Sequence, residues 1–154
     1  MTVFIAFYKG GRRKGESPLK YAWDYAVRLR TASPYSHCEI AIEQGWGVYE
    51  CISSSMRDGG IRGKAMQLPK DRWDILPCTL TEREAREWLS REQGKAYDYA
   101  GALRFVLPFL RQAPQKWFCS EFVAAALGID NPSGQTPASV WKWLLQRQEG
   151  GDRG

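Results

Sequence analysis

The sequence predicts one α+β domain, and three features of its 154 residues support this prediction. A run rich in β-forming residues, Val3–Tyr8, predicts a buried strand. Two further short strands flank the Gly-Trp-Gly segment at 45–47, which has the composition of a hairpin turn. Helix-start signals recur between and after the strands, so we expect a small antiparallel sheet packed against helices. No repeat or linker divides the chain, and we expect one domain over residues 1–148 followed by a flexible tail over residues 149–154.

The other elements follow from local signals. Thr81 and Glu84 form a capping-box pattern, which is the clearest helix start in the chain. The expected helices cover residues 18–30, 82–93, 97–107, 119–127 and 137–148. The residues expected to form the buried side of the first helix are Leu19, Ala22, Trp23, Ala26 and Leu29 or Arg30. A further strand is expected at Trp73–Cys78, whereas the glycines within 56–70 indicate a loop.

The charge of the chain limits its partners. It has 22 Lys and Arg against 17 Asp and Glu, a formal net charge of +5 and a pI near 9.1. We therefore expect an anionic polymer or surface, such as a bacterial cell wall, to be a compatible partner. The basic residues are scattered and form no groove-binding pattern, so no specific nucleic acid is expected as a partner, and the oligomeric state stays open.

The cysteines and the single histidine suggest neither a metal site nor a cofactor. Four cysteines show no CxxC spacing, and one histidine is too few for a typical zinc site. A domain of this size needs no disulfides, so we expect four free thiols. The N-terminal apolar run is too short for a signal peptide, and no stretch reaches the ~20 apolar residues that a membrane span requires. We expect a cytoplasmic or phage-associated protein.

Cys119 is the candidate nucleophile. It begins a short apolar helix that contains Phe122 and Val123 and is expected to stop at Gly128. A thiol in the first turn of a helix lies near unpaired backbone N–H groups and the positive end of the helix dipole, and both favour the thiolate. The alternative is a buried structural cysteine.

His37 is the candidate base because it is the only histidine in the chain. It opens the first strand of the expected hairpin, and Glu50 lies on the second strand. A four-residue turn at 43–46 would place Glu50 diagonally opposite His37 on the same face, whereas a slip of one residue would turn it to the other face. Glu39 and Glu43 share the face of His37 and are alternatives to Glu50 as the carboxylate that orients the imidazole.

The predicted register has a consequence for two other cysteines. It puts Cys38 and Cys51 on the face opposite His37, where we expect both to be buried and inert.

Several short motifs, taken in order, resemble the circularly permuted branch of the NlpC-type papain-like hydrolases, which includes YiiX-like proteins and the lecithin retinol acyltransferase group. The motifs are SHCEIAIE at 36–43, GVYECISS at 47–54, GKAYD at 94–98, WFCSEFV at 117–123 and TPASVWKWL at 136–144. In this branch the histidine strand precedes the cysteine helix, as His37 precedes Cys119 here. The resemblance covers residues 3 to 145.

The resemblance implies a thiol hydrolase that cleaves an amide bond through an acyl-enzyme, most simply a peptidase or amidase acting on cell-wall peptide. Cys119 would attack, His37 would act as base and then as acid, and Glu50 would orient His37. Tyr35, Tyr97 and Trp117 are candidates for substrate contact, although core packing is a simpler role for the tyrosines. The alternatives are an acyltransferase or lipid/ester deacylase of the same fold, and a non-catalytic binding module.

Overall fold

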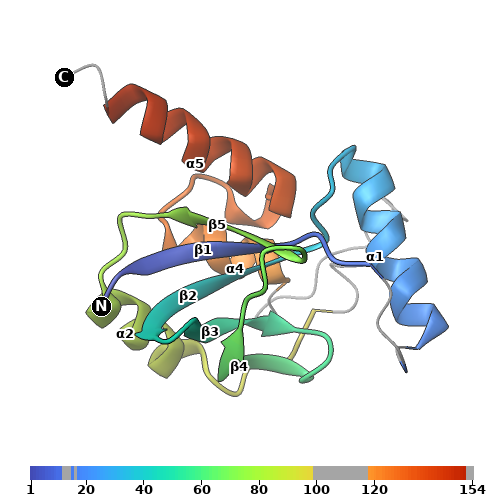
Figure 1. Cartoon of the computed structure of the whole chain (residues 1–154), viewed down its shortest axis with the longest axis horizontal. Helices are drawn as coiled ribbons and strands as arrows, with labels where there is room; N and C mark the ends of the chain where they lie inside the picture. The colour runs from blue at the N-terminus through green and yellow to red at the C-terminus, as the bar shows by residue number, and fades with distance from the viewer. Residues whose placement is uncertain (12–14, 16, 99–117, 152–154) are drawn as a thin grey trace.

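A computed structural model describes residues 1–11, 15, 17–98 and 118–151, and it confirms the α+β class. Five antiparallel strands form one sheet in the order β4-β3-β2-β1-β5 (Figure 1). The strands are β1 Val3–Tyr8, β2 His37–Gly45, β3 Val48–Ser55, β4 Gly60–Gln67 and β5 Trp73–Pro77. The described helices are α1 Pro18–Thr31, α2 Glu82–Glu92, α4 Cys119–Ala126 and α5 Pro137–Gly151, with a short 3-10 turn at Pro132–Gly134.

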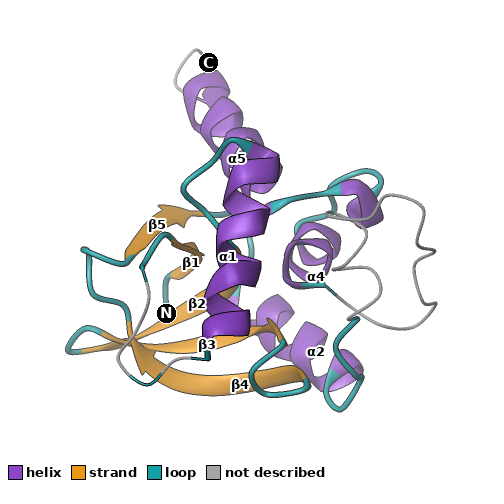
Figure 2. Ribbon diagram, turned by 90° about the vertical axis from the view of Figure 1, so that its right-hand side faces the viewer, coloured by secondary structure: helices purple, strands orange, loops and turns teal. Residues whose placement is uncertain are grey.

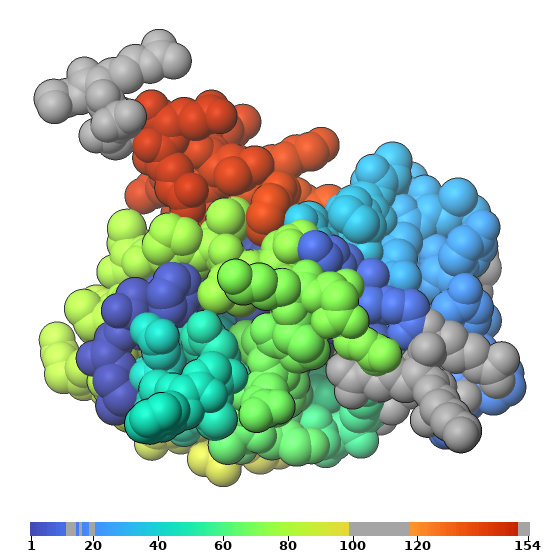
Figure 3. All heavy atoms as spheres, in the orientation of Figure 1, coloured from blue at the N-terminus to red at the C-terminus, as the bar shows by residue number. Residues whose placement is uncertain are grey.

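The sheet buries its two faces in different ways. One face carries Ile5, Ile40 and Ile52, which form the main core with α2, α4 and α5. Figure 2 shows α2 and α4 together on that side of the sheet. On the other face a smaller cluster forms around Ala41 and Trp73, and in Figure 3 the strands and their loops themselves form most of the visible surface below α5. Successive apolar side chains of β1 and β2 therefore pack into a cluster on each face of the sheet, as expected for central strands.

The β2–β3 register differs from the predicted one for two reasons: the turn is shorter and lies further along the chain, and the pairing is irregular just before it. Trp46 and Gly47 have positive φ values of 55° and 72°, and Gly45 pairs directly with Val48. This is the two-residue turn that requires φ > 0 at both central positions, rather than a four-residue loop. A register irregularity between Glu43 and Gly45 then shifts the pairing by one residue, so that Glu50 pairs with Ile42, where Gly47 was expected.

The expected loop at 56–70 is wrong over most of its length, because β4 occupies Gly60–Gln67 and pairs with the whole of β3. Two glycines that suggested a loop instead permit close packing. A Cβ on Gly60 would lie 2.3 Å from the Lys95 carbonyl oxygen, and one on Gly63 would lie 2.9 Å from Leu89 Cδ2. Gly60 and Gly63 are therefore sites of close approach, which is a common role for glycine inside a strand.

The predicted buried side of α1 is confirmed for Trp23 but is wrong for Ala22, Leu29 and Arg30. Val27 is buried, whereas Leu29 is 70% exposed and Ala22 is exposed as well. The helix lies at one end of the sheet (Figure 1), where it contributes Trp23 to a small satellite cluster of buried residues.

The predicted starts of α2 and α5 are confirmed. Thr81 and Glu84 form the predicted capping box, with the Thr81 N–H donating to Glu84 Oε2 at 2.8 Å and the Glu84 N–H donating to Thr81 Oγ1 at 3.2 Å. Thr136 caps α5 by accepting the Ser139 N–H at 3.1 Å. That helix continues to Gly151, three residues beyond the boundary expected at 148, and residues 152–154 of the expected tail lie outside the described residues.

One expected helix begins differently. Tyr97 is not helical, since its N–H donates to the Gly59 carbonyl at 3.0 Å beside an isolated bridge between Gly60 and Ala96. Most of the helix expected over 97–107 falls outside the described residues.

Candidate active site

A cavity of about 170 Å³ lies where the starts of α4 and β2 meet, with α1 and β4 forming its sides. Its lining includes both predicted chemical groups, Cys119 and His37, which are 82 residues apart in sequence. Helix α4 packs against β2 and β3 through an almost fully buried first six residues. The apolar sequence of this helix is therefore what brings its N-terminal thiol to the end of β2.

Cys119 occupies the first position of α4 and is 1% exposed. Glu121 supports this helix start by accepting the N–H of Phe118 at 3.2 Å. Burial raises the pKa of the Cys119 thiol, but hydrogen bonds from Cys38 and His37 and the charge of His37 outweigh burial and hold that pKa well below its usual value. These contacts favour the thiolate form of Cys119 beside a protonated His37.

His37 opens β2 and its side chain is 22% exposed. Its Nε2 lies 2.9 Å from Oε1 of Glu39, which leaves Nδ1 for the hydrogen bond with Cys119. Burial lowers the pKa of His37, but the Cys119 thiolate and Glu39 outweigh burial and raise it to about 10. The ring is therefore held between a sulfur and a carboxylate, the arrangement required of a general base oriented by a third group.

Glu39, not Glu50, is the carboxylate that contacts His37. The two residues are two apart on one strand and therefore share a face. Glu50 lies on the opposite face because its partner is Ile42, and it forms an ion pair with Arg86 of α2 at 2.6 Å. The prediction that Glu50 contacts His37 is wrong because it assumed an unbroken register. The one-residue irregularity between Glu43 and Gly45 turns Glu50 to the other face.

The other alternative, Glu43, lies six positions along β2 from His37, roughly 20 Å away at the usual rise per residue. It shares the strand but not the site, so Glu39 is the one candidate carboxylate that reaches the imidazole.

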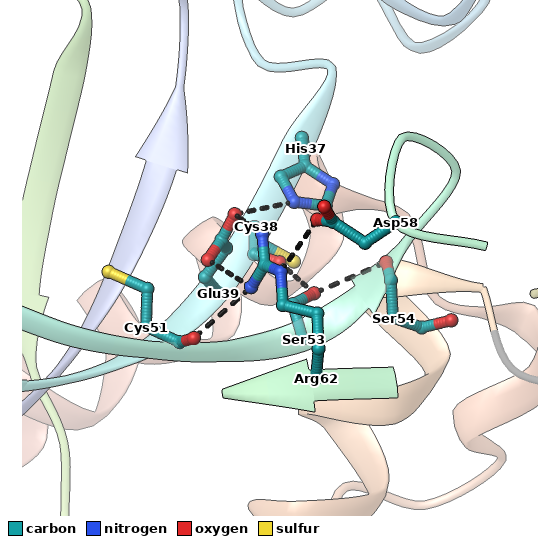
Figure 4. A network of polar contacts seen from close by, with 8 residues as sticks. All are labelled: His37, Cys38, Glu39, Cys51, Ser53, Ser54, Asp58 and Arg62. Carbon is teal, nitrogen blue, oxygen red and sulfur yellow. Dashed lines mark hydrogen bonds and ion pairs between the residues drawn. The ribbon is translucent and has the colours of Figure 1, made fainter. Parts of the chain in front are cut away.

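A residue that the sequence reasoning missed, Arg62 of β4, completes the polar network (Figure 4). Its Nη1 and Nη2 donate to the two oxygens of Glu39 at 2.9 and 3.1 Å, and its Nε donates to Asp58 Oδ2 at 2.8 Å. Burial raises the pKa of Glu39, but hydrogen bonds and charges from His37 and Arg62 lower it to about 2. The alternation of Arg62, Lys64 and Met66 with smaller residues was the available signal for a strand here.

Cys38 and Cys51 are both buried, as expected, but they lie on opposite faces of the sheet. Cys51 shares the face of Glu39, contrary to the prediction, because it pairs with Ala41. Cys38 faces the helices, and its thiol hydrogen-bonds with Cys119. Burial raises the pKa of both thiols, and for Cys38 the adjacent Cys119 thiolate adds to the rise. Cys38 therefore belongs to the surroundings of the site as a protonated donor.

The predicted aromatic contacts separate into three outcomes. Tyr97 is 3% exposed and lines the cavity beside Phe118, with ring centroids 6.1 Å apart. Tyr35 does not line it and belongs to the core, where its hydroxyl donates to Asp74 Oδ2 at 2.8 Å and its ring packs against Trp141. Trp117 lies outside the described residues.

In the described part of the chain, four aromatic residues that the sequence reasoning did not select also line the cavity: Tyr8, Trp23, Trp73 and Phe118. Trp73 is packed 5.1 Å from Tyr8 and 6.5 Å from the His37 ring, measured between ring centroids. These rings form an apolar wall next to the imidazole.

Within the described parts of the chain, no group of three or more His, Cys, Asp or Glu side chains is arranged to hold a metal ion. No described helix has the length and apolar character needed to cross a membrane. No protein-family model and no curated protein matches the sequence.

Proposed function

We propose that this protein is a cysteine hydrolase in which Cys119 is the nucleophile, His37 the general base and acid, and Glu39 the orienting carboxylate. One observation carries the proposal: in the lining of one cavity, the only histidine contacts a buried thiol at a helix start on one side and a buried carboxylate on the other. The pKa of Cys119 is lowered and that of His37 is raised, which favours a thiolate–imidazolium pair at neutral pH.

The proposed reaction is cleavage of an amide through an acyl-enzyme. The Cys119 thiolate attacks the carbonyl carbon, and the imidazolium of His37 gives its proton to the departing amine, so that a thioester forms as the C–N bond breaks. Neutral His37 then takes a proton from water, the hydroxide attacks the thioester, and the thiolate is expelled as the acid is released. The backbone N–H of Cys119, at the start of α4, is a suitable donor for the oxyanion in both steps.

The order of a histidine strand before a cysteine helix supports the proposal that the chain is related to circularly permuted NlpC-type papain-like hydrolases. We propose cell-wall peptide or a related conjugate as the substrate, because a net charge of +5 favours an anionic polymer. We also propose a cytoplasmic or phage-associated location, from which the protein would meet the wall on lysis.

The test is a paired assay of wild type and Cys119→Ala on purified sacculi and on phospholipid vesicles. We expect wild type to release new amine ends from sacculi and Cys119→Ala to release none. Cys78→Ala is the matched control, since Cys78 lies outside the cavity with its thiol directed to the Val3 carbonyl at 3.5 Å, and it should behave as wild type.

Other outcomes would replace the proposal. Release of free fatty acid from vesicles, with sacculi left intact, would indicate an ester deacylase or acyltransferase. A Cys119 that is unreactive, with neither substrate cut, would indicate a non-catalytic binding module.

A further inference from the structure

The guanidinium of Arg62 is fixed by hydrogen bonds to three different residues. Its Nη1 donates to Glu39 and to the Cys51 carbonyl, its Nη2 donates to Glu39, and its Nε donates to Asp58. The side chain of Arg62 is 17% exposed and that of Glu39 is 2% exposed. A guanidinium fixed by three groups can in turn fix the plane of a bidentate carboxylate.

The two parallel hydrogen bonds from Arg62 to Glu39, called the fork below, determine how the negative charge of Glu39 is shared between Arg62 and His37. Oε1 of Glu39 accepts from both His37 and Arg62, while Oε2 accepts from Arg62 alone. Without Arg62, the imidazolium of His37 would be the one cationic partner near this buried carboxylate among the contacts described. It would then bind the carboxylate's whole charge, and the imidazolium would release its proton less readily.

We propose that Arg62 is a positioning residue, which holds Glu39 in the orientation that bonds His37 and shares the negative charge of that carboxylate. This inference rests on the proposed function, because it assigns Arg62 a role in the proton transfers of His37. Asp58, at the turn between β3 and β4, fixes the guanidinium from its far side, as Figure 4 shows.

Two properties of Arg62 are separable by substitution. Arg62→Gln removes the charge, whereas Arg62→Lys keeps a charge but cannot form the fork. Arg86→Gln is the matched control, since it also removes an arginine that pairs with a glutamate of the hairpin, Glu50, but on the opposite face of the sheet.

The first measurement is the NMR titration of the His37 imidazole, which is unambiguous because the chain has one histidine. We expect Arg62→Gln to raise the midpoint by about one pH unit, as is typical when a nearby like charge is removed. Arg62→Lys and Arg86→Gln should stay near wild type. An unchanged or lowered midpoint in Arg62→Gln would overturn the shared-charge part of the proposal.

The second measurement is the rate at which iodoacetamide alkylates Cys119 across pH. In Arg62→Gln the alkaline limb of this rate profile should move to higher pH. In Arg62→Lys it should stay in place while the rate falls several-fold, because the fork is lost. Arg62→Lys indistinguishable from wild type in both rate and pH would refute a positioning role. A loss of stability alone would lower the folded fraction without moving the limb.

The double variant Glu39→Gln/Arg62→Gln covers the case in which Arg62→Gln does not fold. If Arg62 acts through Glu39, adding Arg62→Gln to the Glu39→Gln variant should change the His37 midpoint less than Arg62→Gln changes it in wild type. Where Arg62→Gln alone does not fold, the added change should be smaller than the change that Glu39→Gln itself causes. An equal or larger additional change would contradict the proposal. The NMR titration needs no turnover and therefore tests Arg62 independently of activity. Wild type that cleaves no substrate would refute the proposed function. Wild type with a reactive Cys119, but with the same pH profile in Arg62→Gln, would refute only the role of Arg62.

Discussion

His37 and Glu39 can meet because they are two residues apart on one strand. Successive side chains alternate between the faces of a sheet, so residues i and i+2 share a face whatever the register with the neighbouring strand. A partner on the next strand, such as Glu50, shares that face only for one parity of the register. The same-strand pair is thus the arrangement that a change in the β2–β3 turn leaves intact.

At this scale we predict that Cys119 is the fastest of the four thiols to react with iodoacetamide at pH 7. Its pKa is lowered, whereas burial raises the pKa of Cys38, Cys51 and Cys78. Mass mapping of partially alkylated protein measures the four rates, and Cys38 or Cys78 reacting first would contradict the site.

The matched pair Glu39→Gln and Glu50→Gln then tests the carboxylate. A hydrogen bond to a charged group contributes ~1.5–3 kcal/mol, so Glu39→Gln should slow alkylation of Cys119 by about 10- to 100-fold. Glu50→Gln removes the ion pair with Arg86 on the other face and should leave the rate near that of wild type. Equal slowing in both variants would show that the face of the sheet does not matter.

Strand β4 is the element on which the polar network depends, because it carries Arg62. The strand forms an edge of the sheet, and it is pinned there by the contact of Gly60 with the segment that follows α2. The Ile61 N–H donates to the Lys95 carbonyl at 3.1 Å, and the Tyr97 N–H donates to the Gly59 carbonyl at 3.0 Å. These bonds require the two backbones to approach closely, and a side chain at Gly60 would prevent it.

We therefore predict that Gly60→Ala destabilises the protein by ~1–3 kcal/mol, the usual cost of inserting a methyl group into a closely packed position. The added Cβ would lie 2.3 Å from the Lys95 carbonyl oxygen, so the backbone has to move. Urea unfolding followed by tryptophan fluorescence measures the change. Gly150→Ala is the control, since a Cβ there meets nothing within 4 Å, and it should be neutral or slightly stabilising. Equal stability of the two variants would mean that Gly60 is not a packing constraint.

For the whole molecule, sequence reasoning succeeded where the signal was local. The alternation of Val3–Tyr8, the capping box at Thr81 and the thiol at the start of α4 are each set by neighbouring residues, and the structure has all three elements in place. It failed where the answer depends on another segment. Choosing between Glu39 and Glu50 required knowledge of the register irregularity between β2 and β3. Finding Arg62 required a strand whose glycines indicate a loop until Lys95 and Leu89 are seen beside them. The site joins elements from both groups, so the sequence predicted that Cys119 and His37 meet, offered Glu39 only as an alternative and missed Arg62.

The stability of the whole molecule should depend on pH through this network. The pKa of Glu39 is about 2 in the folded protein against 4.5 ordinarily, since the favourable contacts with His37 and Arg62 outweigh its burial. A lowered folded-state pKa stabilises the protein above the unfolded value, and this contribution is lost as pH falls from about 4.5 toward 2. By linkage the loss attributable to Glu39 is on the order of 3 kcal/mol. We predict that the free energy of unfolding of wild type, measured in urea at pH 7, 4.5 and 3, falls more steeply with acid than that of Glu39→Gln. Glu39→Gln should be less stable than wild type at pH 7, and the two curves should converge at low pH. Parallel curves would show that the carboxylate of Glu39 is not held ionised by its neighbours, and the orienting role proposed for it would fail with them.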